Sequence, residues 1–232
     1  MNEFTSNAKH GKLITVAVIG LVAVVAVTVA ITWAITGTGT PQDTPPDAAP
    51  PSGQLDPYTD SLTIIAGSDV FDGVSVGYPQ SLIGAVSAAT EFTSQVLSTL
   101  DPERAKAVGE VISSATLTSH DFTAAPMSTR RSLRAPASGP VPDGYSIAVA
   151  PVAYQSLSFS DTRMDLLLLA YTSTTRPGES RSLHIGVAAV TMTWESGDWR
   201  WAPMDTDDDY TSITVEVNSP QAPALGWIRL TR

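Results

Sequence analysis

The 232-residue sequence contains no cysteine. The chain therefore has no disulfide to stabilise its fold, no thiol nucleophile and no cysteine ligand for zinc or an iron–sulfur cluster. An exported domain of this composition must be stable through its hydrophobic core alone. Roughly 170 residues follow the proline-rich part of the chain, which is enough for one domain with a sizeable core.

Basic residues are also few. Lys and Arg together number 13 against 23 Asp and Glu, so the formal net charge is −10. Without Lys9, Lys12 and Glu3 the remainder holds 11 basic and 22 acidic residues, and Lys106 is its one lysine. Such an acidic surface repels phosphates and anionic lipid headgroups, so we expect neither nucleic acid nor anionic headgroups as direct partners. Solubility is the ordinary explanation of the charge.

The chain does have one long apolar segment, LITVAVIGLVAVVAVTVAITWAI from Leu13 to Ile35. Its 23 residues include no charge, amide side chain or proline. As a helix they would span about 34 Å, enough for a bilayer core of about 30 Å. Because a backbone in lipid must satisfy its own hydrogen bonds, a single run of this kind has to be helical. We therefore predict a transmembrane helix at 13–35.

The charges beside this segment indicate its orientation. Lys9 and Lys12 precede it, and the first charge after it is Asp43. The positive-inside rule then predicts a cytoplasmic tail at 1–12 and a single-pass plasma-membrane protein whose C-terminal domain lies outside. A cleaved signal peptide is one alternative, but its apolar region would be about 7 to 15 residues long, and Trp33 suits a retained anchor. The other alternative is that residues 13–35 form a helix buried in the core of a soluble domain.

Prolines and glycines dominate residues 36–60, and large apolar side chains are scarce there. Such a composition cannot bury enough surface to fold, and its prolines favour an extended, semi-rigid spacer. We predict a disordered Pro/Thr/Gly-rich linker at 36–60 that holds a folded extracytoplasmic domain, 61–232, away from the membrane. A proline-rich ligand for a partner domain is the alternative.

Helices are expected first in the folded region. After an extended arm at Gly73–Pro79, apolar residues recur at spacings of three and four from Leu82 to Leu100, with Ser81 as the N-cap. A second helix should begin at Asp101-Pro102 and run to about Ile112. A short third helix fits Met127–Leu133. A solvated surface is the simplest interpretation of the single basic cluster in the exterior part, which consists of Arg130, Arg131 and Arg134.

From Tyr145 the apolar period changes to two, which is typical of strands. Large aromatic side chains near the hairpin turn at 195–198 should pair across strands. Helices followed by an antiparallel sheet indicate an α+β domain. The predicted strands are 147–159 interrupted at Pro151, Arg163–Thr172, Leu183–Trp194, Trp199–Trp201 and a last strand at Thr211–Val217.

Three short motifs follow one another along the chain: Gly-Val-Ser-Val-Gly-Tyr-Pro at 73–79, Gly-Ala-Val-Ser-Ala-Ala-Thr-Glu-Phe at 84–92 and Gly-Asp-Trp at 197–199. Over roughly Gly73 to Met204 they resemble a group of single-pass actinobacterial membrane proteins with an extracytoplasmic nuclear-transport-factor-2-like domain. The resemblance implies a cone in which N-terminal helices pack into the concave face of a curved sheet. Domains of this fold, anchored by one N-terminal helix, also serve conjugation and type IV secretion machinery.

Candidates for catalysis are few. A hydrolytic triad needs a histidine, and the exterior part has only His120 and His184. His184 would face the cone interior together with Asp165 or Tyr171 of the neighbouring strand. Ketosteroid-isomerase-like enzymes of the same fold resemble that arrangement, with a pocket carboxylate as base. Because Arg163 beside Asp165 suits a structural ion pair equally well, we assign no catalytic residue and predict that the protein is not an enzyme.

One acidic stretch resembles a calcium-binding loop. Asp205, Asp207, Asp209 and Glu216 occupy positions 1, 3, 5 and 12 of the template. However, Tyr210 stands where the sharp turn needs glycine, and no flanking helices are predicted. A solvated acidic loop is the simpler interpretation. We assign no metal and no cofactor, and keep these four residues as a weak calcium candidate.

The sequence thus predicts a non-catalytic, membrane-anchored extracytoplasmic domain that acts through protein contacts at the cell envelope. Its expected partners are the lipid bilayer, through the N-terminal helix, and other envelope proteins or a second copy of itself. A component of a conjugal-transfer or secretion assembly is the most concrete form of this hypothesis. The alternatives are a module that binds a small apolar ligand inside the cone and, ranked last, a cone-pocket enzyme using His184 and Asp165.

Overall fold

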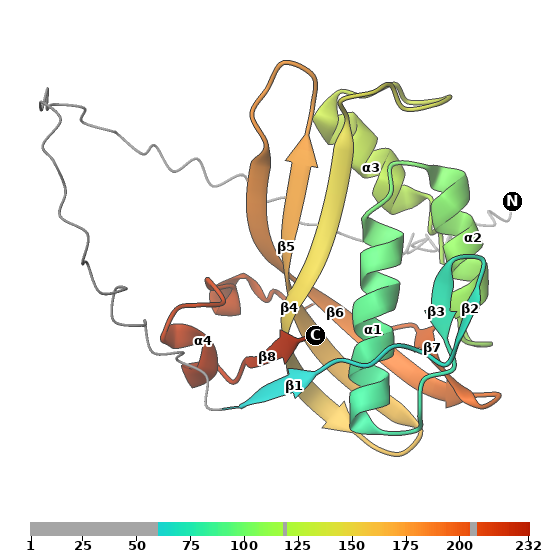
Figure 1. Ribbon diagram of the computed structural model, residues 1–232, viewed down its shortest axis with the longest axis vertical. Helices are drawn as coiled ribbons and strands as arrows, with labels where there is room; N and C mark the ends of the chain where they lie inside the picture. The colour runs from blue at the N-terminus through green and yellow to red at the C-terminus, as the bar shows by residue number, and fades with distance from the viewer. Residues whose placement is uncertain (1–59, 118–119, 205–207) are drawn as a thin grey trace, which may run out of the picture. The chain divides into compact units, whose positions relative to one another are not determined.

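A computed structural model of the chain describes residues 60–117, 120–204 and 208–232 (Figure 1). The expected cytoplasmic tail (1–12), the expected transmembrane helix (13–35) and all but the last residue of the expected linker (36–60) lie outside these ranges. Within them, no helix is both long and apolar enough to cross a membrane.

The described strands form a large sheet and a separate small hairpin (Figure 1). The large sheet has the order β1-β8-β4-β5-β6-β7 and is antiparallel except for the parallel pair β1 and β8. Its strands are β1 (Ser61–Thr63), β4 (Ser146–Phe159), β5 (Arg163–Thr175), β6 (Ser182–Glu195), β7 (Asp198–Ala202) and β8 (Ile228–Thr231). The hairpin consists of β2 (Asp69–Phe71) and β3 (Val74–Val76).

Three long strands, β4, β5 and β6, make up most of the sheet. The predicted strands at 163–172 and 183–194 are confirmed, and each is slightly longer than predicted. The predicted interruption at Pro151 is an irregularity of register between Pro151 and Ala153, and β4 continues through it and through a second irregularity between Ser156 and Ser158. A bulge accommodates a residue without a backbone donor and increases the local twist, which helps the sheet to curve.

The first two helices begin where their capping residues predict. The Ser81 hydroxyl accepts a hydrogen bond from the Gly84 amide at 3.1 Å, and the Asp101 carboxylate accepts one from the Glu103 amide at 3.0 Å. Pro102 occupies the first helical position, where no amide is needed. The helices are α1 (Leu82–Leu97), α2 (Pro102–Ile112), α3 (Ala124–Leu133) and the short α4 (Gln221–Ala224).

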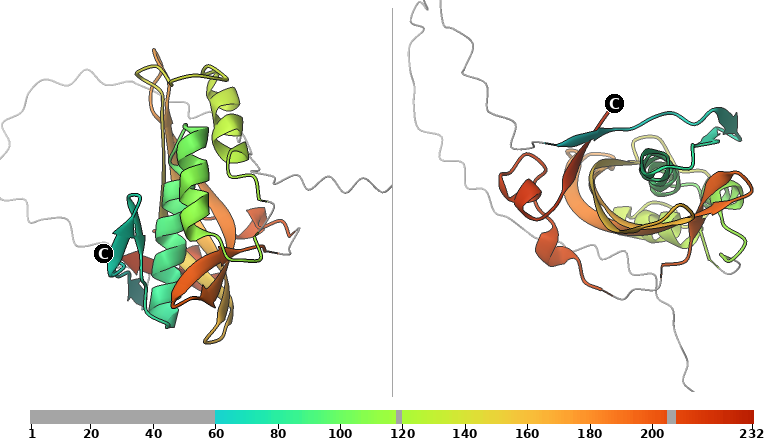
Figure 2. Two further views of the ribbon diagram at one scale, coloured as in Figure 1. Left: turned by 90° about the vertical axis from the view of Figure 1, so that its right-hand side faces the viewer. Right: turned by 90° about the horizontal axis from the view of Figure 1, so that it is seen from below.

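Helix α1 lies within the curve of the sheet (Figure 2, right). Val86 and Phe92 of α1 are fully buried in one cluster with Leu166, Leu168 and Met192 of the sheet. Burial of these side chains is the main stabilising contribution on this inner face, because the free energy of transfer from water grows with buried apolar area. The predicted α+β class, with helices preceding a curved and mostly antiparallel sheet, is confirmed.

The C-terminal segment covers the opposite, outer face of the sheet. Leu167 and Leu169, which alternate with the inner-face residues of β5, pack against Val217, Ala222 and Trp227. Since strand side chains alternate between faces, burial on both faces explains why β5 is an almost continuous apolar run.

The predicted strand at Thr211–Val217 is wrong. The segment begins with a 3-10 turn, Thr211–Ile213, and no strand is assigned to it in the part of the chain that the structure describes. Its alternating Ile213, Val215 and Val217 pack onto the outer face of the sheet instead of pairing with an edge. The last strand is β8, for which the sequence made no prediction.

The predicted arm folds back on itself as the β2–β3 hairpin. Asp72 and Gly73 have φ values of 49° and 75°, the left-handed conformation that a two-residue hairpin turn requires. The Arg104 guanidinium of α2 donates a hydrogen bond to the Asp72 carbonyl at 2.6 Å. The tip of the hairpin is therefore fastened to the helical layer.

Candidate functional site

The arm motif and the hairpin motif meet at one buried carboxylate, that of Asp198 in β7. Asp198 is 5% exposed and accepts hydrogen bonds from the amides of Gly77 (2.9 Å), Tyr78 (3.0 Å) and Trp199 (2.8 Å). The guanidinium of Arg200 lies 3.8 Å from the same carboxylate. Hydrogen bonds from amides to a charged acceptor are stronger than neutral ones. Asp198 therefore joins two segments that lie about 120 residues apart.

The helix motif joins the same junction through Pro79. The indole Nε1 of Trp199 donates to the Pro79 carbonyl at 2.9 Å, and a Cβ at Gly84 would lie 1.9 Å from that oxygen. Only glycine lets α1 approach the arm so closely. Tyr78 packs edge-to-face on Phe92 with ring centroids 6.1 Å apart, and its burial raises the pKa of the Tyr78 hydroxyl. The three motifs thus build the fold.

Asp165 sits in a polar cluster on the outer face of the sheet. Its carboxylate accepts hydrogen bonds from the hydroxyls of Ser158 and Thr191, both at 2.7 Å, and pairs with Arg163 at 2.9 Å. Partial burial by itself would raise the pKa of Asp165, but the hydrogen bonds from Thr191, Ser158 and Arg163 outweigh it and hold that pKa below its usual value. The structure therefore favours the ion-pair interpretation of Asp165.

The expected pairing of His184 with Asp165 or Tyr171 is not formed. His184 lies opposite Thr172 in the β5–β6 ladder, so its side chain belongs to the inner face, whereas Asp165 and Tyr171 belong to the outer face. Asp165 lies opposite Thr191, seven positions further along β6, a separation of about 23 Å. His184 is exposed, and its Nε2 is 2.8 Å from the hydroxyl of Ser182.

The calcium candidate is only partly described. Asp205 and Asp207 lie outside the described residues. The Asp209 carboxylate accepts hydrogen bonds from the amide and the hydroxyl of Thr211, at 2.9 and 3.0 Å, and these hold the pKa of Asp209 below its usual value. Glu216 accepts a hydrogen bond from the Tyr171 hydroxyl at 2.7 Å. Among the described residues, no group of three or more His, Asp or Glu is arranged to hold a metal ion.

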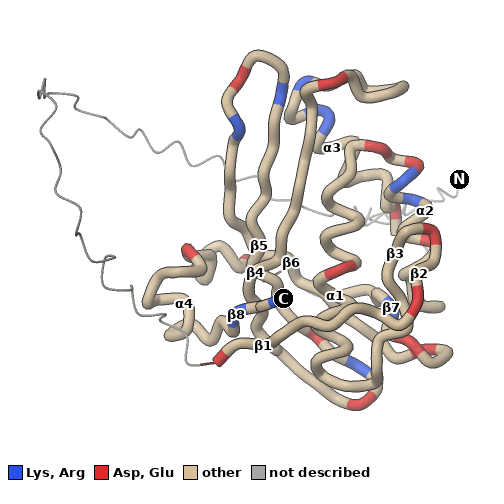
Figure 3. The backbone as a smooth tube through the Cα atoms, in the orientation of Figure 1, with Lys and Arg blue, Asp and Glu red and all other residues tan. Residues whose placement is uncertain are grey.

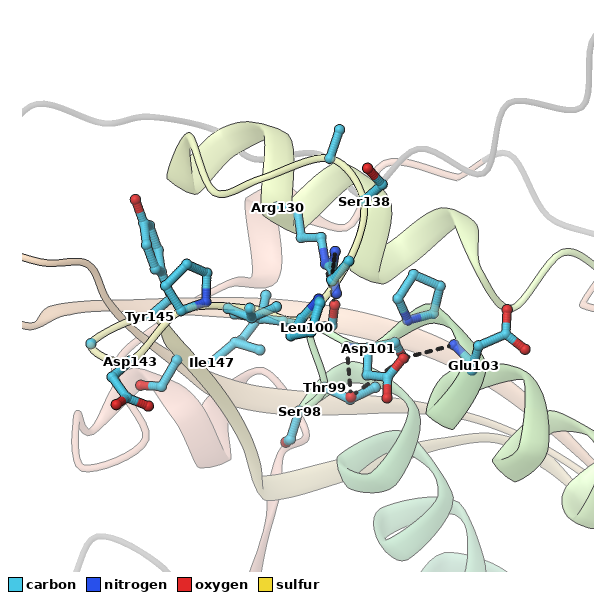
Figure 4. A pocket seen from close by; sticks show the side chains of 18 residues that line it. Ser98, Thr99, Leu100, Asp101, Glu103, Arg130, Ser138, Asp143, Tyr145 and Ile147 are labelled. Atoms are coloured by element: carbon cyan, nitrogen blue, oxygen red, sulfur yellow. Dashed lines mark hydrogen bonds between the residues drawn. The ribbon is translucent and has the colours of Figure 1, made fainter.

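A hollow of about 940 Å³, open to solvent, lies where the α1–α2 turn faces the loop that leads into β4 (Figure 4). Arg130 of α3 forms part of its wall and is only 4% exposed. Its guanidinium donates to the carbonyls of Leu100, Pro136 and Gly139. Since these hydrogen bonds tie the loop to the α1–α2 turn, Arg130 has a structural part in this wall.

The predicted solvated basic cluster is therefore right for two of its three members. Arg131 and Arg134 are exposed, but Arg130 is buried. The sequence contained a signal for this burial, because Arg130 lies four positions after Pro126 and three before Leu133, and all three are buried on one face of α3.

The tip of the arm hairpin exposes two large apolar side chains. Val70 is 64% exposed and Phe71 is 60% exposed, and all three residues of β2 are exposed. Neither side chain was predicted from the sequence to be exposed. The Asp72-Gly73 dipeptide, which follows them and precedes another apolar residue, is the signal that would have indicated a hairpin.

Comparison with known proteins identifies a family but no characterised relative. No curated protein gives a significant match, and no solved structure does. The family model that matches spans residues 67–221, which include all three motifs and most of the sheet but neither β1 nor β8. That span is more than half of the 232 residues. The chain therefore belongs to the family described as a domain of unknown function, DUF8175.

Proposed function

We propose that this protein is a non-catalytic, membrane-anchored component of the cell envelope whose exterior domain acts by contacting other proteins. The observation that carries the proposal is the arm hairpin with Val70 and Phe71 in water. Val70 and Phe71 are consecutive in β2 and therefore lie on opposite faces of the hairpin, so a partner that covers one of them would gain roughly 1 to 2 kcal/mol before ordering costs are subtracted. Large apolar side chains left exposed on a projecting hairpin are typical of a protein-binding surface.

The hairpin is held in place before any partner arrives. The Arg104 guanidinium donates to the Asp72 carbonyl at 2.6 Å and to the Gln95 side chain at 3.2 Å. The Gly67 amide donates to the Ser75 hydroxyl at 3.1 Å, which links the base of the hairpin to β3. Because these hydrogen bonds already order the hairpin, binding there would lose little conformational entropy.

The proposed membrane anchor and exterior domain are inferred from residues 1–60 of the sequence. The uncharged run at 13–35, the lysines before it and the proline-rich linker after it favour a cytoplasmic N-terminus and an exterior domain on a spacer. A single N-terminal anchor followed by a domain of helices and a curved sheet is also the arrangement that we expect of a component of a conjugal-transfer or secretion assembly. That role is the most specific form of the proposal.

The contact is tested by photo-crosslinking in intact membranes. A photoreactive residue in place of Phe71 of the full chain should yield an adduct with a second envelope protein. The same residue in place of Ser132, which is exposed on α3, serves as the matched control. If position 71 gives only uncrosslinked monomer, or the same adducts as position 132, the protein-contact proposal fails.

The anchor is tested separately by fractionation. The full chain should stay in the membrane pellet after alkaline carbonate extraction, and protease added outside intact cells should digest the domain. Deleting residues 13–35 should release the protein from the pellet. Carbonate release of the full chain, or protection of its domain from external protease, would contradict the proposed location.

A further inference from the structure

The first nine residues of β6 form a free edge of the sheet. β7 pairs only with Thr191–Glu195, so Ser182–Val190 is bonded to β5 on one side and to no described strand on the other. In Figure 1 this part of β6 is the outermost strand of the upper half of the sheet. Unpaired backbone groups of this kind are a ready template for another strand.

The other edges of the described sheets are short, partly covered or irregular. On the side away from β5, β4 pairs with β8 only at Ala153 and Tyr154, but its remaining edge contains Pro151 and two irregularities of register. β1 and β2 have only three residues each. Beside β7, the Ser114 amide donates to the Trp201 carbonyl at 2.8 Å, and beside β4 the Val149 amide donates to the Ser98 hydroxyl at 2.8 Å. The free part of β6, Ser182–Val190, contains no proline, no Lys, Arg, Asp or Glu, and no irregularity of register. It therefore lacks the prolines, charged side chains and bulges that prevent the edge strands of natural proteins from pairing with one another.

We infer that two copies of this chain pair through the free edges of β6, antiparallel and about a two-fold axis at Gly186. Gly186 is the midpoint of Ser182–Val190, so this register uses the whole free edge. Gly186 then faces Gly186 of the second copy, and Ile185 faces Val187 in both directions. Pairs of β-branched residues directly opposite one another are favourable, and an interface related by a two-fold axis must be self-complementary in this way.

The inner face of the sheet is open at Gly186, through which the proposed two-fold axis passes. No atom lies within 4 Å of the position that a Cβ on Gly186 would occupy. The neighbouring residues 185–189 are all half-buried, as expected for a strand whose face is covered but whose edge is open. A side chain introduced at Gly186 for a crosslink therefore fits without displacing its neighbours.

The charges at the two ends of β6 favour the antiparallel arrangement. The turn before β6 contains Arg176 and Arg181, of which Arg176 pairs with Glu179, and the other end of β6 is the acidic residue Glu195. Basic residues of α3 and of the turn between β5 and β6 lie at the same end of the domain, where Figure 3 also shows acidic residues among them. An antiparallel pair places the basic end of each copy toward the acidic end of the other, whereas a parallel pair would align like charges.

The linker cannot be the strand that fills this edge. Residues 36–59 contain no proline-free stretch longer than five residues. Proline lacks the backbone donor that a ladder needs, so this segment cannot match nine consecutive residues of β6. A second copy of the chain supplies a strand of the required length, polarity and charge distribution.

This inference deepens the proposed function, on which it rests for its setting, by naming a second copy as one partner. A shared membrane would raise the effective concentration of the domains for each other. The pairing itself involves only residues of β6. It can therefore be tested on purified full-length chain in detergent, and its failure there would leave the contact at Phe71 and the anchor untouched.

The absence of cysteine makes a disulfide test specific. Directly opposed residues of an antiparallel pair have Cα atoms about 4.5 to 5.5 Å apart, within the range for a disulfide. Gly186→Cys should therefore give a covalent dimer under mild oxidation. Ala188→Cys, two positions along the same strand, would place its two sulfurs about 13 Å apart and should give none. Ala150→Cys, exposed on β4, controls for random collision.

Equal crosslinking of Gly186→Cys and Ala188→Cys, or no crosslinking of either, would overturn the inference. A second measurement needs no cysteine. Every second backbone amide of residues 183–189 points away from β5. In the unaltered chain these amides should exchange more slowly with deuterium as protein concentration rises, and Gly186→Lys should abolish that dependence because like charges would meet at the axis. Fast exchange at every concentration would also refute the pairing.

Discussion

Replacing Asp198 with alanine should destabilise the domain by about 4 kcal/mol. The change removes the acceptor of the Gly77 and Tyr78 amides, at 2.9 and 3.0 Å. Each amide would be left without a partner at a site where the carboxylate is only 5% exposed, at a cost of about 2 kcal/mol apiece. Since a domain of this size is stable by only about 5 to 15 kcal/mol, the loss should be readily measurable.

Equilibrium unfolding in urea, followed by tryptophan fluorescence, measures this effect on the full chain. Asp198→Asn keeps one acceptor oxygen and should lie between the wild type and the alanine variant. Asp161→Ala removes an equally charged but exposed side chain from the β4–β5 turn and should change the unfolding free energy by less than about 0.5 kcal/mol. If Asp198→Ala costs no more than Asp161→Ala, the carboxylate does not hold the junction together.

Three further changes test other parts of the fold. Gly84→Ala should lower the unfolding free energy by about 2 kcal/mol or more, because its Cβ would lie 1.9 Å from the Pro79 carbonyl, whereas Gly186→Ala meets no atom within 4 Å and should be tolerated. The lowered pKa of Asp165 contributes stability above the unfolded-state value of 3.8, and this stability is lost as the pH falls through the folded-state pKa. Asp165→Asn should therefore reduce stability at neutral pH and flatten the decline of the unfolding free energy that urea titrations measure as the pH falls below 3.8. Trp227→Phe removes the hydrogen bond to the backbone of the C-terminal segment and should lower the thermal midpoint at a cost of about 1 to 3 kcal/mol.

Local signals predicted the elements that are long or capped. The Ser81 and Asp101 caps located two helices, and the apolar runs at 163–172 and 183–194 located the two central strands. The three-residue β1 was beyond such reasoning, because three residues cannot establish a period of two. The four-residue β8 was missed for the same reason.

The error at Thr211–Val217 has a different cause. Its alternation is real, and Ile213, Val215 and Val217 do belong to the outer core cluster. Alternation states only that every second side chain faces the core, which a segment lying across a sheet face satisfies as well as a strand at an edge. A pattern within one segment cannot distinguish the two, since the difference lies in which backbone groups are paired.

The junction around Asp198 shows a second limit of local reasoning. Each motif was visible in the sequence, but the contact of Asp198 with Gly77 and Tyr78 spans about 120 residues. The wrong pairing of His184 with Asp165 has a related origin. Their strands are neighbours, as predicted, but the register places His184 opposite Thr172 and on the other face of the sheet. A shift of one position in a ladder moves every side chain to the opposite face.

Both faces of the central sheet are already used within the domain. α1 covers the inner face, and the segment that contains Val217 and Trp227 covers the outer one. The surfaces left for other molecules then include the sheet edges, the projecting hairpin and the first part of β6, where His184 on the inner face is exposed. The exposed hairpin pair of Val70 and Phe71 and the free edge at Ser182–Val190 belong to different sheets. A domain of this design can pair with a second copy through β6 and still present its hairpin to a different protein, so that the two contacts are independently removable.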